Sequence, residues 1–120
     1  MADRAALGRR GEAVAARYLE RRGYVIRTRN YRCPHGEIDL IAVADGYLVF
    51  VEVKTRATGQ GLHPSLSVTR RKQERLRQLG LYYLAQHEEE HATPLQPRFD
   101  VIAVLLDGEA EHVEHIVNAF

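Results

Sequence analysis

The chain has 120 residues, enough to bury one hydrophobic core, and we expect a single domain over residues 1–120. Hydrophobic residues make up 45% and charged residues 28%, a composition typical of soluble globular proteins. Because no apolar run is long enough to cross a bilayer and a single cysteine excludes an intrachain disulfide, we expect a cytoplasmic protein without a membrane partner.

The net charge of +1 conceals an asymmetry along the chain. Residues 1–35 contain nine Arg and three acidic residues, a balance of 9 − 3 = +6. Residues 98–120 contain one Arg and five acidic residues, a balance of 1 − 5 = −4. The basic segment indicates either a local anionic partner or a solvated helix face, and charge alone does not decide between the two.

Residues from about Ala2 to Arg22 are predicted to form a helix, because apolar and small side chains recur at helical spacing and Gly23 follows as a C-cap. Glu12 lies at the edge of the apolar stripe, where a carboxylate must be paired, protonated or coordinated. Two interpretations remain open. Glu12 is a surface group paired with a nearby arginine, or it is a functional group delivered to the strands that follow.

A first strand is expected at Tyr24–Asn30, where apolar and basic residues alternate, followed by a connector over Tyr31–His35. Residues 36–56 are predicted to form a β-hairpin with its turn at Asp45-Gly46. Both central residues of a two-residue type I′ turn need φ > 0, which Asp-Gly provides.

This turn fixes the pairing of the hairpin, so that Ala44 faces Tyr47 and the numbers of facing residues sum to 91. The same sum places Asp39 opposite Glu52 and Glu37 opposite Lys54. All four charged side chains are then expected on one face of the hairpin.

Two carboxylates directly opposed in an apolar hairpin repel each other. A divalent cation such as Mg²⁺, which prefers carboxylate oxygens, would remove that repulsion. The alternative is a structural ion pair between Glu37 and Lys54 beside an acidic patch, and it leaves Asp39 opposite Glu52 unexplained.

Gly59, Gly61 and Pro64 indicate a loop over residues 57–67, either a segment that closes over substrate or a plain connector. Thr69 is a candidate N-cap for a second helix that runs to about Gln86. Lys72 is expected on the inward stripe at the start of this helix, either as a snorkelling lysine or as a functional group.

A strongly apolar fourth strand is expected at residues 99–106 and a fifth, an edge strand, at residues 111–117. We expect a structural role for Asp100 and exposed side chains for His112 and His115. The predicted order is α-β-β-β-α-β-β, an α/β fold in which helices flank a central mixed β-sheet.

Several motifs together carry a resemblance to known proteins. They are Gly11-Glu12, residues 36–41 (GEIDLI), residues 50–56 (FVEVKTR), Lys72, residues 98–100 (RFD) and residues 116–120 (IVNAF). The chain resembles the YraN-like family of uncharacterised bacterial proteins, within the PD-(D/E)XK, or restriction-endonuclease-like, nuclease superfamily. The resemblance covers essentially the whole chain and implies a restriction-endonuclease-like fold.

The resemblance also implies a metal site. Asp39 and Glu52 match the residues that bind Mg²⁺ (or Mn²⁺) in the superfamily, and Glu12 matches a helix residue that often completes the site. Lys54 matches the lysine that activates or orients the attacking water.

The chemistry of metal-assisted phosphodiester hydrolysis, which needs a bound metal ion and neutralisation of developing charge, suggests roles for further residues. The carbonyl of Val53 is a candidate metal ligand, and Lys72 is a candidate catalytic residue that neutralises charge together with Arg56. The remaining candidates for contacts with nucleic acid are Arg29, Arg70, Arg71 and Gln73.

The charged hairpin and the resemblance together predict a Mg²⁺-dependent endonuclease that acts on DNA, and the resemblance implies selectivity for DNA structure, as in Holliday-junction resolvases. Two other functions are kept open, a non-catalytic nucleic-acid-binding module and a subunit that depends on a partner for activity. A homodimer is compatible with all three.

Overall fold

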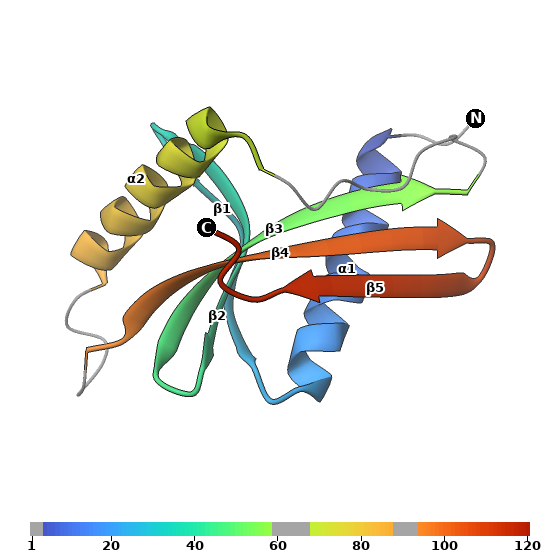
Figure 1. Ribbon diagram of the computed structural model, residues 1–120, viewed down its shortest axis with the longest axis horizontal. Coiled ribbons are helices and arrows are strands. Elements are labelled where there is room, and N and C mark those ends of the chain that lie inside the picture. Colours follow the sequence, from blue (N-terminus) through green and yellow to red (C-terminus); the bar gives the residue numbers. More distant parts are fainter. Residues whose placement is uncertain (1–3, 59–67, 88–93) are drawn as a thin grey trace.

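Apolar residues on both faces of the central strands place the sheet in the middle of the molecule, with one helix on each face. The computed structural model describes residues 4–58, 68–87 and 94–120 (Figure 1). Its elements are α1 (Arg4–Arg21), β1 (Val25–Cys33), β2 (Gly36–Ala44), β3 (Tyr47–Ala57), α2 (Arg70–Gln86), β4 (Gln96–Asp107) and β5 (Ala110–Ile116). The predicted order α-β-β-β-α-β-β and the mixed sheet are confirmed.

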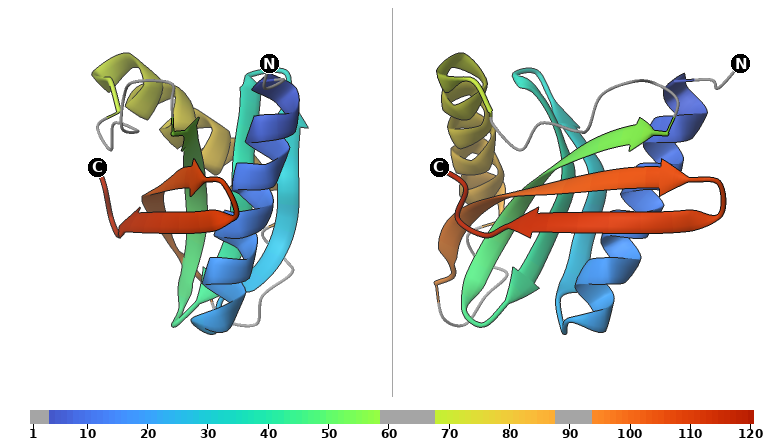
Figure 2. Two further views of the ribbon diagram at one scale, coloured as in Figure 1. Left: turned by 90° about the vertical axis from the view of Figure 1, so that its right-hand side faces the viewer. Right: turned by 45° about the vertical axis from the view of Figure 1, so that its right-hand side comes forward.

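The five described strands lie in the order β1-β2-β3-β4-β5. Only β3 and β4 are parallel, and the other neighbours are antiparallel. The two helices cover opposite faces of the sheet, as the left view of Figure 2 shows. Val14, Ala15 and Leu19 of α1 pack on one face, and Leu76, Leu79 and Tyr83 of α2 pack on the other. No helix in the described part of the chain is long and apolar enough to span a membrane.

The hairpin turn forms as predicted. Asp45 and Gly46 both have positive φ, 49° and 82°, and the pairs from Ala44–Tyr47 to Leu40–Val51 all have numbers that sum to 91. Beyond Leu40 and Val51 the pairing of β2 with β3 ends, whereas β3 remains paired with β4 as far as Ala57. The sheet therefore forks after Leu40 and Val51.

Strand β2 is irregular at the fork. Ile38 belongs to the cluster under α2 and Leu40 to the cluster under α1, although residues two apart in a regular strand share a face. In β1, Asn30 has a φ of 53°, and the pairs of β1 with β2 pass from Arg29–Leu40 to Tyr31–Ile38. Asp39, the residue of β2 between Ile38 and Leu40, is thus paired with neither β1 nor β3.

Several predicted boundaries need correction. The first strand continues through the expected connector to Cys33, because Tyr31 and Cys33 pair with Ile38 and Gly36. The fourth strand begins earlier, at Gln96, because its parallel partner β3 already pairs from Tyr47. Residues 59–67, which contain the predicted loop glycines and Pro64, and Ala2 lie outside the described residues.

Helix α1 lies unusually close to β3 at Gly11. A Cβ atom built there would lie 1.9 Å from Oγ1 and 2.7 Å from Cβ of Thr55. Only a residue without a side chain permits this approach. Gly11 therefore sets the distance at which Glu12, the next residue, is held against the fork.

Candidate active site

Asp39 is the group at the centre of the fork. Its Oδ2 accepts a hydrogen bond of 2.8 Å from the backbone N–H of Val53. This N–H belongs to β3 just beyond the last pair with β2, so the carboxylate replaces a main-chain acceptor that β2 no longer provides. The predicted cross-strand pair Asp39–Glu52 does not form, because the strands have already separated there.

Glu52 lies on the α2 side of the sheet, where its Oε1 binds Nζ of Lys72. The side chain of Glu52 is 12% exposed and that of Lys72 is 45% exposed. Lys72 is in place because Thr69 caps α2, with the Thr69 hydroxyl accepting a hydrogen bond from the Lys72 N–H. Helix α2 therefore brings the positive charge of Lys72 to the carboxylate of Glu52.

The electrostatics connect Asp39 to the surrounding carboxylates. Burial, followed by the charge of Glu52, raises the pKa of Asp39 from 3.8 to about 7, and the hydrogen bond from Val53 opposes the shift. The charges of Glu12 and Glu37 raise the pKa further. The fork thus concentrates negative charge in a partly buried place.

Lys54 is affected in the opposite sense. Burial is the largest cause that lowers its pKa, followed by the positive charge of Lys72, and Arg56 adds to the effect. The charge of Glu52 opposes the change. Lys54, Lys72 and Glu52 therefore interact as one cluster.

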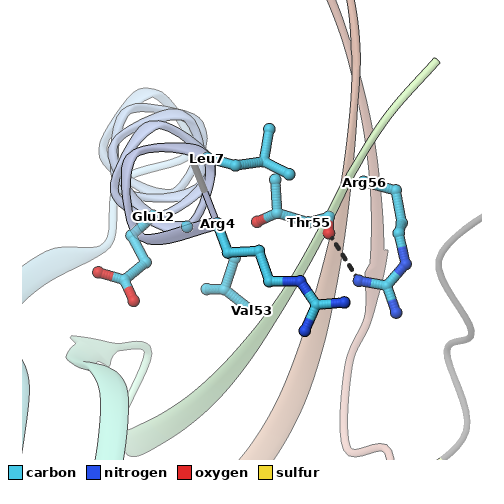
Figure 3. Close-up of a pocket in the computed structure, with 7 residues that line it drawn as sticks. Arg4, Leu7, Glu12, Val53, Thr55 and Arg56 are labelled. Carbon is cyan, nitrogen blue, oxygen red and sulfur yellow. Dashed lines mark hydrogen bonds between the residues drawn. The ribbon is translucent and has the colours of Figure 1, made fainter. Parts of the chain in front are cut away.

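Glu12 lines a cavity of about 610 Å³ between α1 and β3 (Figure 3). Val53 and Thr55 line it from β3, and Arg4 and Arg56 contribute two guanidinium groups. Arg4 and Thr55 were not predicted as site residues. The sequence could have indicated Arg4 as a neighbour of Glu12, because residues 4, 8 and 12 are spaced by four and so lie on one side of the helix.

Of the other residues predicted to contact nucleic acid, the three arginines are exposed, whereas Gln73 is engaged within the protein. Arg70 and Arg71 are exposed in the first turn of α2, close in sequence to Lys72. Gln73 instead turns its amide toward the carbonyl of Val68, at 2.8 Å, and so helps to hold the start of α2. Arg29 is exposed on β1, 3.8 Å from Glu20.

Glu37 does not pair with Lys54. Its carboxylate lies 3.1 Å from Nε of Arg32, on the neighbouring strand β1. The predicted pairing of Glu37 with Lys54, on which the alternative of a structural ion pair rested, does not form, because β2 pairs only with β1 on this side of the fork.

Asp100 has the structural role expected of it, but His115 is not exposed as predicted. The Asp100 side chain is fully buried and that of His115 is only 6% exposed. Oδ2 of Asp100 lies 2.7 Å from Nε2 of His115 and 2.9 Å from Nη2 of Arg98, and Oδ1 accepts from the N–H of Asn118 at 3.0 Å. A buried carboxylate needs such partners, and His115 is drawn inward to be one of them.

The donor set at the fork suits Mg²⁺ better than a softer ion. Asp39 and Glu52 offer hard carboxylate oxygens, and Mg²⁺ is commonly held by one or two carboxylates together with water. Within the described ranges, no three side chains of His, Cys, Asp or Glu are grouped so as to hold a metal ion. Glu12 therefore does not complete a three-ligand group with Asp39 and Glu52, as the resemblance had implied.

Comparison with known proteins agrees with the motifs. The profile described as "Uncharacterised protein family UPF0102" matches residues 11–104. The chain belongs to the UPF0102 family. Membership confirms the resemblance to YraN-like proteins. The matched range includes Glu12, Asp39, Glu52, Lys54 and Lys72.

Relatives within UPF0102 match nearly end to end. A UPF0102 protein of Geobacter metallireducens is 45% identical over 114 residues, 95% of this chain and 91% of the relative. One from Pelotomaculum thermopropionicum is 47% identical over 123 residues, with both chains fully covered. One from Beutenbergia cavernae is 47% identical over 112 residues, 92% of each chain. UPF0102 membership therefore applies to the whole described fold.

Proposed function

We propose that this UPF0102 protein is a metal-dependent nuclease that hydrolyses phosphodiester bonds of DNA. The observation that carries the proposal is the fork itself, where Asp39 and Glu52 lie close enough for the charge of one to raise the pKa of the other. Lys54 and Lys72 interact with the same cluster. Two carboxylates and two amines gathered where β2 parts from β3 are groups that metal-assisted phosphate hydrolysis can use.

Asp39, Glu52 and the carbonyl of Val53 would hold the Mg²⁺ ion. When bound, Mg²⁺ supplies a Lewis acid for the phosphate oxygens and lowers the pKa of water. Glu12 adds negative charge close to Asp39 and strengthens the attraction for a divalent cation. The cation would also relieve the repulsion that raises the pKa of Asp39.

Lys54 is the candidate for proton transfer. Burial and the charge of Lys72 lower its pKa, and its amine would activate or orient the attacking water. Lys72 neutralises charge that develops on the phosphate. Arg56, Arg70 and Arg71 would hold neighbouring phosphates, contacts that fix position and do not identify sequence.

A non-catalytic nucleic-acid-binding module is the second candidate. The ion pair of Lys72 with Glu52 favours it, because the ammonium group already supplies positive charge to this carboxylate without a metal. In that function the fork holds a phosphate but breaks no bond.

A cleavage assay with purified protein separates the two functions. Plasmid, linear duplex, single-stranded DNA and a four-way junction are incubated with Mg²⁺, Mn²⁺ or EDTA. We expect metal-dependent cleavage, with the four-way junction as the preferred substrate, and a loss of about 100-fold or more in Asp39→Asn and Glu52→Gln.

Glu109→Gln is the matched control, because Glu109 is an exposed carboxylate at the β4–β5 turn. It should cleave like the wild type. Binding of DNA without cleavage under any metal condition supports the second candidate. Equal cleavage by wild type and Asp39→Asn contradicts the proposed site. Sedimentation in the same buffers tests whether a homodimer forms with the junction.

A further inference from the structure

A second hollow, of about 370 Å³, lies between the C-terminal half of α1 and the edge strand β5. The cavity with Glu12 is lined from β3, so β4 lies between the two cavities in the sheet. The side chains that matter here are Arg17, Tyr18, Arg21, Arg22 and Glu111. None of them takes part in the fork.

The hollow is basic. Three arginines and one glutamate line it, a formal balance of 3 − 1 = +2. Arg17 donates from Nη2 to Glu111 at 2.9 Å, and both side chains remain partly open to solvent, 53% and 35% exposed. Arg21 in the last turn of α1 also interacts favourably with the negative end of the helix dipole. The dipole does not explain why three guanidinium groups surround one hollow.

Tyr18 lines the hollow and is held in place by contacts with Arg22 and His115. The guanidinium carbon of Arg22 lies over its ring, 4.6 Å from the centroid. The Tyr18 hydroxyl is 3.3 Å from Nδ1 of His115, which in turn contacts the buried Asp100. Arg22 is thus held on a ring that is itself tied to the core, and a planar guanidinium held in place suits a phosphate.

We infer that this hollow binds a backbone phosphate of the nucleic acid and acts as an anchoring point outside the fork. The inference rests on the proposed function for the identity of the ligand. Arg21 follows Glu12 by nine residues, about 14 Å along a helix that rises 1.5 Å per residue. Along the axis of a DNA duplex, each strand has one phosphate per about 3.4 Å, so this distance corresponds to about four phosphates of one strand.

The test is the salt dependence of DNA binding in EDTA, where no cleavage is needed. A fluorescein-labelled duplex of about 20 base pairs is titrated with protein from about 50 mM to about 200 mM salt. Arg21→Gln and Arg22→Gln should each make the negative slope of log K against log salt shallower, by up to about 0.9. Arg9→Gln is the control, because Arg9 is an exposed arginine of α1 that does not line the hollow.

Each outcome separates the two proposals. A shallower slope in Arg21→Gln and Arg22→Gln but not in Arg9→Gln supports the anchoring point, even if the wild type cleaves nothing. Metal-dependent cleavage with equal slopes in all three variants overturns the anchoring point and leaves the nuclease intact. A wild type that binds no duplex overturns the anchoring point as well.

Chemical shifts give a second readout. Titration with inorganic phosphate should move the amide signals of Tyr18 and Val113 in the wild type, and Arg21→Gln should weaken this response. Shifts that appear only elsewhere on the protein contradict the inference.

Discussion

At the scale of single residues, Asp39 decides how the fork responds to pH. Its pKa in the folded protein is about 7, above the ordinary value of 3.8. Between these two values the folded state binds a proton that the unfolded state releases. The stability of the metal-free protein should therefore be highest below pH 4 as far as this group is concerned, and should fall as pH rises toward 7.

Asp39→Asn removes this pH dependence, because an amide does not titrate while its oxygen can still accept from the Val53 N–H. We expect the variant to be as stable as the wild type, or more stable, at pH 8 without metal. Urea unfolding of both proteins between pH 5 and pH 8, extrapolated to water, measures the difference. A fall in stability of equal steepness in both proteins would assign the pH dependence to other groups.

Asp39→Asn also tests whether Asp39 binds a divalent cation. Mg²⁺ or Mn²⁺ at a hundredfold excess over its dissociation constant should stabilise the wild type by about 2.7 kcal/mol, because it binds only the folded state. Asp39→Asn should lose this gain. Thermal melts with and without metal measure it, and equal shifts in both proteins would show that Asp39 holds no cation.

At the scale of elements, the contact of α1 with β3 depends on Gly11. Gly11→Ala places a methyl group against Thr55 and should destabilise the fold by about 1–3 kcal/mol, as overpacking does. Because Glu12 follows directly, the variant should also weaken any function of the fork beyond its loss of stability.

Gly8→Ala is the control for this prediction. Gly8 is in the same helix, but a Cβ atom there meets nothing within 4 Å. The better helix propensity of alanine should stabilise the protein by about 0.5–1 kcal/mol. Denaturant melts of the two variants should shift in opposite directions, and shifts of the same sign would mean that α1 can move away from β3 at no cost.

At the scale of the whole molecule, Asp100 joins distant parts of the chain. It bonds Arg98, His115 and the N–H of Asn118, while Arg98 donates to the Tyr24 hydroxyl at 2.7 Å. These partners come from β4, β5, the residue before β1 and the C-terminal segment. Their hydrogen bonds hold the pKa of Asp100 below its ordinary value despite burial.

Asp100→Asn should destabilise the fold by about 3–5 kcal/mol, because Arg98 keeps its charge in a half-buried place without a matching carboxylate. The stabilising effect of Asp100 is present above pH 4 and is lost as pH falls, the opposite sign to Asp39. Thermal melts at neutral pH measure the loss. Asp107→Asn, at the exposed end of β4, should change stability by about 0.5 kcal/mol or less, and equal losses in both variants would contradict the role of the network.

Local chemistry along the sequence determined the elements of this protein. The Asp45-Gly46 turn fixed the hairpin and its register, Thr69 fixed the start of α2, and apolar residues on both faces of the central strands fixed a sheet covered on both sides. Each of these depends on residues a few positions apart, through φ preference, capping or side-chain period. The motifs around Asp39 and Glu52 were sufficient to identify the family.

Only the tertiary structure decided how the charged groups meet. The fork separates Asp39 from its expected partner and turns it to the main chain of Val53, while packing of α2 brings Lys72 to Glu52 across 20 residues of sequence. His115 is drawn inward by Asp100, and three arginines converge between α1 and β5. These contacts depend on where strands part and how helices cross the sheet, and long-range packing sets both.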